Sequence, residues 1–318
     1  TANLIAAEDD TTISISPVAA IEGGGGVPAS PANQIVDIVL NAGEHLQLLQ
    51  NAELTGSIVQ SDKPIGLIAG NTAMQAPVGT AYADHGEQMI PPIRALGNEY
   101  AAVMHRPRAN EPSIWRVIGA VDGTALSYSA GVGGPATIDQ GQRVDFITGE
   151  PFVISSQDAD HPFMLFNLMA GSQWANQPGL SGRGDADFVI SVPPAQYLRN
   201  YVFFADPTYP TTNLVLVRRR TAGQFHDVTL DCAGVLGGWA ALGTDYEWTR
   251  FNLIDGDFQA NGMCSTGSHQ ISSDGYFGLW VWGWGTPDTG IFTQNVSYGY
   301  PGGMNVAPIN EVVIPPVG

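Results

Sequence analysis

The residues of this chain that could do chemistry are mostly carboxylates in turns. The chain has 318 residues, with 30 acidic against 12 basic side chains and a formal net charge of −18 at pH 7. Asp255, Asp257 and Asn261 lie close enough in the sequence to offer oxygen ligands to calcium. The segment lacks the remaining ligands and the closing glutamate of a calcium loop, and aspartates commonly cap turns. A structural calcium ion at this place is a hypothesis beside that of an ordinary turn, and we expect no other metal and no cofactor.

The histidines do not form a catalytic motif. They are dispersed along the chain, which contains no HExxH sequence, no G-x-S-x-G elbow and no glycine-rich nucleotide loop. Asp84 and His85 lie near Glu87, but no nucleophile accompanies them. Few basic side chains are available to stabilise an anionic transition state. We therefore predict no catalytic residues and a protein that is not an enzyme.

The two cysteines, Cys232 and Cys264, are the only ones in the chain. We predict that they form a disulfide, which implies an oxidising compartment. Two buried thiols are the alternative, and a metal pair is disfavoured because no histidine stands at ligand spacing. Asn295-Val296-Ser297 is an N-glycosylation sequence that matters only in a host that reads it. Arg183-Gly184-Asp185 spells the integrin-binding tripeptide, which we interpret as a chance match.

Three tryptophans, Trp280, Trp282 and Trp284, alternate along one apolar segment. In a strand they would all point to the same face. If that face is exposed, they could form an aromatic platform for a sugar ring. If it is buried, they belong to a core, where aromatic side chains contribute much of the packing.

The elements that must position these side chains follow a pattern that the chain repeats three times. An acidic turn leads into an apolar, strand-forming run at Asp62–Leu67, Asp160–Leu165 and Asp274–Leu279. Proline or tyrosine stands two residues after the aspartate, where proline suits the first residue of a strand. The repeats recur at intervals of roughly 100 residues, the usual size of a sandwich domain.

Composition supports an all-β fold built from these repeats. The 39 glycines and 22 prolines follow no collagen-like period, so they indicate many turns between short strands. We predict three tandem, internally repeated β-sandwich-like or jelly-roll-like units, packed together and spanning residues 1–95, 96–205 and 206–318, the last with the disulfide. A propeller is disfavoured because its blades repeat at about 40 to 50 residues.

The charge and hydropathy of the chain exclude two classes of partner. An acidic surface repels nucleic acid, which binds basic patches. No run of 18 apolar residues exists that could span a membrane. The partner classes that remain are other proteins, glycans and copies of this chain.

Ordered short motifs along the whole chain resemble the amino-terminal region of IgG-Fc-binding proteins and its bacterial relatives. The motifs are Ser61–Pro64, Gly70-Asn71, Asp84-His85, Gln88–Pro92, Val192–Pro194, Tyr197, Tyr201–Phe203, Gly267–His269, Ser273-Asp274, Phe277-Gly278, Val281–Trp284 and Tyr298–Met304. The resemblance implies an extracellular or cell-surface module without enzyme activity, concerned with mucus, adhesion or surface binding.

We therefore expect a binding or adhesion module whose partner is a protein or glycan on a surface or in an extracellular matrix. The alternatives are a structural subunit of a fibre or surface assembly, which would involve self-association, and a carbohydrate-active enzyme. Loops carry such functions on β folds. The loops after the three repeated strands, 71–84, 171–184 and 285–304, are the predicted working surface, because equivalent loops can share one end of their units.

Overall fold

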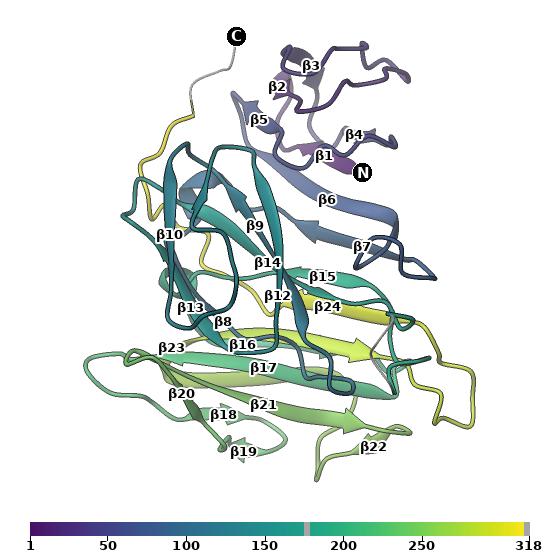
Figure 1. The fold of residues 1–318 in the computed structure, drawn as a ribbon, viewed down its shortest axis with the longest axis vertical. Coiled ribbons are helices and arrows are strands. Elements are labelled where there is room, and N and C mark those ends of the chain that lie inside the picture. Colours follow the sequence, from purple (N-terminus) through teal and green to yellow (C-terminus); the bar gives the residue numbers. More distant parts are fainter. Residues whose placement is uncertain (175–178, 315–318) are drawn as a thin grey trace.

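Strands account for nearly all of the regular structure of the protein (Figure 1). The computed structural model describes residues 1–174 and 179–314. These residues contain no α-helix, and two 3-10 turns, η1 (Ile93–Ala95) and η2 (Pro194–Gln196), stand at proline pairs. The all-β prediction is confirmed. Within the same residues, no helix has the length and apolar character to cross a membrane.

The first part of the chain forms two antiparallel sheets. One has the strand order β4-β1-β6-β7 and the other β3-β2-β5. Their bounds are β1 (Ala2–Ala6), β2 (Thr11–Ser16), β3 (Val36–Leu40), β4 (His45–Leu48), β5 (Ile58–Ser61), β6 (Ile65–Met74) and β7 (Asp84–Met89).

The second part also forms two sheets, in the orders β12-β9-β14-β15 and β11-β10-β13-β8. Their bounds are β8 (Glu99–Ala102), β9 (Ser113–Gly119), β10 (Thr124–Tyr128), β11 (Thr137–Ile138), β12 (Arg143–Thr148), β13 (Phe152–Ser156), β14 (Phe163–Met169) and β15 (Asp187–Ile190).

The third part is one continuous nine-stranded sheet, because a single long strand, β23, takes part in both of its halves. The first half of β23 pairs with β16 and β18, and the second half with β17 and β24. The bounds are β16 (Leu198–Ala205), β17 (Thr211–Arg219), β18 (Val228–Leu230), β19 (Gly234–Val235), β20 (Ala240–Leu242), β21 (Tyr246–Asp255), β22 (Gln259–Ala260), β23 (Gly267–Trp284) and β24 (Ser297–Pro301).

The three parts share one order of strand neighbours. The order β4-β1-β6-β7 matches β12-β9-β14-β15, and both match β21-β17-β23-β24. Pro64 and Pro162 stand between the matching strands β5 and β6, and β13 and β14, while Tyr276 stands between the two halves of β23. The repeated segment therefore occupies the same topological place in all three parts. The turn predicted at Asp274 is wrong, because Asp274 lies inside the continuous strand β23, which contains no proline to interrupt it.

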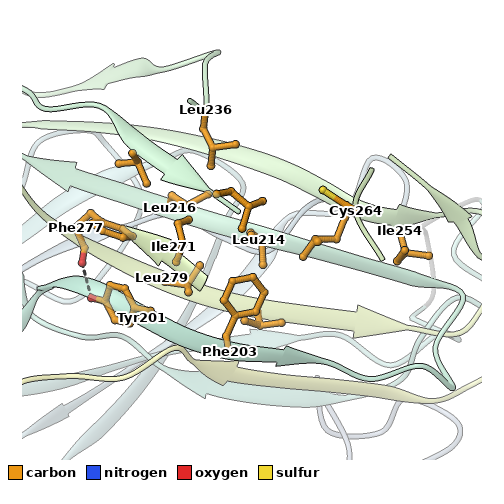
Figure 2. Packing of buried hydrophobic residues seen from close by; sticks show 14 residues of the cluster. Tyr201, Phe203, Leu214, Leu216, Leu236, Ile254, Cys264, Ile271, Phe277 and Leu279 are labelled. Carbon is orange, nitrogen blue, oxygen red and sulfur yellow. Dashed lines mark hydrogen bonds between the residues drawn. The ribbon is translucent and has the colours of Figure 1, made fainter. Parts of the chain in front are cut away.

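A tyrosine anchor recurs in the second and third parts. The Tyr100 hydroxyl donates to the Phe163 carbonyl at 2.6 Å, and the Tyr201 hydroxyl donates to the Phe277 carbonyl. The paired rings lie 4.9 Å apart in both places. Figure 2 shows Tyr201 and Phe277 joined in the core of the third part. Phe163 is the first residue of β14, and Phe277 is where the second half of β23 begins to pair with β17, so each tyrosine holds the start of the matching segment.

Apolar interfaces join the parts to one another. Phe166 and Phe188 pack with Ala76 and Met74 between the first and second parts, and Trp280 packs with Val192 between the second and third. The predicted boundaries near residues 95 and 205 remain a proposal. Strand β16 pairs with β23 of the third part, so we now place the second boundary ahead of β16, at the proline pair of η2.

Candidate functional site

The loops that follow β6, β14 and β23 meet at one end of the molecule. The Gly171 amide donates to the Ala76 carbonyl at 2.7 Å, and the Gly184 amide donates to the Gly285 carbonyl at 2.9 Å. The Ser172 hydroxyl donates to Asn295 Oδ1 at 2.7 Å. We call this surface the loop end, and it comprises residues 75–83, 170–174, 179–186 and 285–296. The predicted bounds 71–84 and 285–304 were too wide, because residues 71–74 continue β6 and residues 297–301 form β24. Residues 175–178 of the predicted loop 171–184 lie outside the described residues. The loops lead into β7, β15 and β24, and β15 lies between the other two strands in space (Figure 1).

The middle loop binds the third loop through Arg183. Its guanidinium donates to Thr286 Oγ1 at 2.9 Å and to Asp288 Oδ2 at 2.5 Å. Gly184 has φ +62°, and a Cβ there would lie 2.9 Å from Arg108 Nη1, so glycine is required. Asp185 is buried. The Arg183-Gly184-Asp185 tripeptide therefore connects the middle loop to the third loop. Its aspartate is buried and is not accessible to an integrin.

The outer loops present apolar side chains to solvent. Val78 is 91% exposed and Phe292 is 82% exposed, while Tyr82 and Ile291 are also exposed. The hydrogen bonds between the loops hold the backbone that carries these side chains. Exposed apolar side chains on loops that contact one another are candidates for an interaction site.

Below this surface lies a buried ionic network that the sequence analysis missed. Glu111 Oε1 accepts from Arg108 Nε at 2.7 Å and lies 3.1 Å from His105 Nε2. Arg108 also donates to the carbonyls of Ala170 and Arg183, at 2.6 and 2.8 Å. All three ionisable side chains are buried. The network thus fastens both ends of the middle loop to the segment His105–Glu111.

The charges in this network hold Glu111 ionised. Burial raises the pKa of Glu111, but the Arg108 guanidinium and His105 lower it more, so its pKa lies well below the usual range. The residues of the network come from one short segment, His105–Glu111. The only sequence signal was an arginine three residues before a glutamate, which is too common to indicate a buried pair.

Two buried aspartates mark the base of the loop end. Burial, with a smaller contribution from the charge of Asp84, raises the pKa of Asp187 to about 8, although the hydrogen bond from the Phe188 amide lowers it. Burial also raises the pKa of Asp185. Asp187 accepts a hydrogen bond from the Phe188 amide at 2.7 Å. A carboxyl group with this pKa keeps its proton at neutral pH.

The tryptophan platform is not formed. Trp280, Trp282 and Trp284 do share one face of β23, but that face packs against the second part of the fold, and their side chains are 7%, 1% and 2% exposed. The His105 ring lies 5.1 Å from the Trp282 ring. The sugar-platform hypothesis is wrong because a neighbouring unit covers the face that a lone sandwich would expose.

The residues of the calcium hypothesis lie in different environments. Asp255 receives two hydrogen bonds from the Arg106 guanidinium, at 2.8 and 2.9 Å. Asp257 and Asn261 are exposed, and the Asn261 side chain donates to the Asn252 carbonyl. An arginine that already neutralises the first carboxylate disfavours a cation there. The calcium site stays a hypothesis that would require Arg106 to move.

The cysteines are joined as predicted. Cys232 and Cys264 form a disulfide in the third part of the fold, beside the core shown in Figure 2. Asp231 Oδ1 and His269 Nδ1 lie next to it, 2.9 Å apart. Because Cys232 is bonded to Cys264, its sulfur is not a thiolate ligand. Asp231, Cys232 and His269 therefore do not form a metal site.

We expect removal of this disulfide to destabilise the third part. The bond closes a loop across 32 residues, and the chain-entropy relation gives about 3 to 4 kcal/mol for a loop of this length. Urea unfolding of the Cys232→Ala, Cys264→Ala protein should show this loss. Reduction of the unaltered protein with dithiothreitol is the control, and an unchanged midpoint in both would contradict the prediction.

A family model described as IgGFc binding protein matches residues 1–283. No curated protein and no solved structure matches the chain.

Proposed function

Because the chain belongs to the IgGFc binding protein family, we propose that it is a non-enzymatic extracellular module that binds a partner through the loop end. The observation that carries this proposal is the meeting of three equivalent loops at one surface with exposed apolar side chains. Loops held on a packed β scaffold are the usual place for recognition.

The proposal includes a repeated architecture of three sandwich-like units. The matching strand orders and the two tyrosine anchors support it. Tandem units in which the same loop follows the same strand can bring those loops together, and the contacts between units fix their relative positions. The loop end is then a composite surface that no single unit would form.

An extracellular location agrees with the disulfide and the acidic surface. A protein partner is favoured because the exposed side chains are apolar and aromatic, such as Phe292 and Tyr82. The family description names the Fc portion of immunoglobulin G, so a purified Fc fragment is the first probe and a purified mucin is the second.

We expect Phe292→Asp and Val78→Asp each to weaken binding of at least one of these probes by tenfold or more, because a charge replaces an apolar contact in a desolvated interface. Biolayer interferometry with immobilised probe measures the dissociation constant. Val235→Asp is the matched control, since Val235 is an exposed apolar residue on β19, away from the loop end.

Three outcomes would contradict the proposal. Full affinity in both loop variants, or no binding of either probe by the unaltered protein, would remove the loop end as the binding surface. Ordered filaments of the purified protein in electron microscopy would favour the structural-subunit alternative. Turnover of a glycan that is lost on changing a single carboxylate would favour the carbohydrate-active alternative.

A further inference from the structure

The first part of the fold lacks one strand that the other two parts possess. In the second part, the sheet β11-β10-β13-β8 has four strands, and in the third, β16 pairs with β23 in the place that corresponds to β8. The corresponding sheet of the first part is β3-β2-β5, with three strands. Among the described residues, no strand pairs with the outer edge of β5.

The register of the ladders identifies the matching residues on the two edges. Ile15 lies opposite Val59 as Tyr128 lies opposite Ile154. In the sheet beside it, Leu4 lies opposite Leu67 as Val117 lies opposite Leu165. Val59 therefore matches Ile154, which is the residue opposite Tyr100 of β8.

The extra strand completes the apolar core where it is present. Ile154, Phe163 and Leu165 are fully buried in the second part, at 0% exposure. Their counterparts in the first part, Val59, Ile65 and Leu67, are only half-buried. The missing strand thus leaves a partly open apolar strip beside an unpaired strand edge.

The edge of β5 lacks two of the features that usually prevent strand addition, although the strand is short. Its residues, Ile58–Ser61, include no charged side chain and no proline. The Asp62 amide donates to the Thr12 carbonyl of β2 at 3.2 Å. Since successive amides of a strand alternate in direction, the Ser61 and Val59 amides point away from β2, toward the open edge.

One other segment comes near this edge. The Gln60 side chain donates to the Ile314 carbonyl at 2.7 Å, so the end of the described chain passes beside β5 (Figure 1). This contact uses a side chain, and within residues 1–174 and 179–314 the backbone of β5 has a ladder partner on the β2 side alone.

We propose that the outer edge of β5 binds an extended segment of a partner polypeptide by antiparallel strand addition. The segment carries a tyrosine that is followed by small or apolar residues. The two internal strands show this chemistry, because Glu99–Ala102 contains Tyr100 and Leu198–Ala205 contains Tyr201. Backbone pairing supplies affinity, and the tyrosine packs over Ile65 as Tyr100 packs over Phe163.

The test uses a synthetic peptide with the sequence of residues 98–103, Asn-Glu-Tyr-Ala-Ala-Val. Isothermal titration calorimetry should show saturable binding of one peptide per protein. A peptide with alanine in place of the tyrosine should bind at least tenfold more weakly. Equal affinity for the two peptides would overturn the proposed recognition of tyrosine.

A matched pair of variants locates the site. Ser61→Pro removes the outward amide that matches Ser156, whose amide donates to the Asn98 carbonyl at 2.8 Å. It should abolish peptide binding, whereas Ser61→Ala keeps the amide and should bind normally. Circular dichroism shows whether each variant is folded. If the Ser61→Pro protein does not fold, the affinities of the Ser61→Ala protein for the two peptides still test the proposal.

A second copy of the chain is the alternative occupant of the β5 edge, and it would give a different experimental result. A concentration-dependent dimer in sedimentation, lost in Ser61→Pro, would assign the edge to a second copy and overturn the proposal. Absence of peptide binding would overturn it as well. The Phe292→Asp protein should bind the peptide normally, so failure of the loop end as a binding surface leaves this result unaffected.

Discussion

Replacing Glu111 with glutamine is expected to destabilise the protein by about 3 to 5 kcal/mol, the usual effect of removing one partner from a buried ion pair. The substitution leaves the Arg108 guanidinium buried without its carboxylate. It also weakens the hydrogen bonds by which Arg108 holds the carbonyls of Ala170 and Arg183. Urea unfolding followed by tryptophan fluorescence measures the loss.

Asp145→Asn is the matched control for this substitution. Asp145 also pairs with an arginine, Arg116, at 2.7 Å, but the pair lies at the surface, where it contributes within about 1 kcal/mol. Similar losses in the two variants would show that burial does not set the strength of the Glu111 pair. The pKa of Glu111 is lowered in the fold, so its contribution is present above about pH 4.3 and is lost as pH falls through the folded value.

Asp187 is expected to make the protein less stable as pH rises. Its pKa is about 8 in the fold and about 3.9 in an unfolded chain. The folded state therefore holds this proton more tightly, and the stabilisation is complete below about pH 4 and is lost as pH rises through 8. The titratable groups near the Asp187 carboxyl are Asp84 on β7 and Tyr209. The Phe188 amide also donates a hydrogen bond to this carboxyl.

Melting temperatures measured from pH 5 to 9 test this prediction. Asp187→Asn replaces the protonated acid with a neutral group of the same shape, so the variant should lose much less stability between pH 6 and 9 than the unaltered protein. Asp160→Asn removes a carboxylate from an exposed turn and serves as the control for net charge. Parallel pH profiles of the unaltered and Asp187→Asn proteins would show that Asp187 ionises without penalty in the fold.

Several features were predictable because they depend on neighbours in the sequence. The acidic segment and the apolar strand that follows it recur at Asp62, Asp160 and Asp274 and occupy matching places in the topology, although only Asp62 and Asp160 lie between strands. The alternation of Trp280, Trp282 and Trp284 placed them on one face of a strand. The cysteine pair had few alternatives, and the ordered motifs identified the family.

Other features depend on how the units pack together. Whether the tryptophan face of β23 was exposed could not be read from its own segment, since residues of another unit, such as Val192, cover it. Strand β16 belongs to the third sheet because the segment that follows the prolines of η2 pairs with β23, and this pairing joins residues far apart in the chain. Local sequence predicts a strand there but not its partner.

The sequence by itself determined the all-β class, the threefold pattern, the disulfide and the family, because turn residues, strand periodicity and cysteine number act locally or by count. Only the tertiary structure decided which surface could bind a partner. It brought three separated loops into contact through bonds such as Gly184 to Gly285 and buried Arg108 with Glu111 beneath them. It also left one edge of β5 without a strand partner in the part of the chain that the structure describes. Each of these depends on contacts between residues far apart in the chain, which no local pattern specifies.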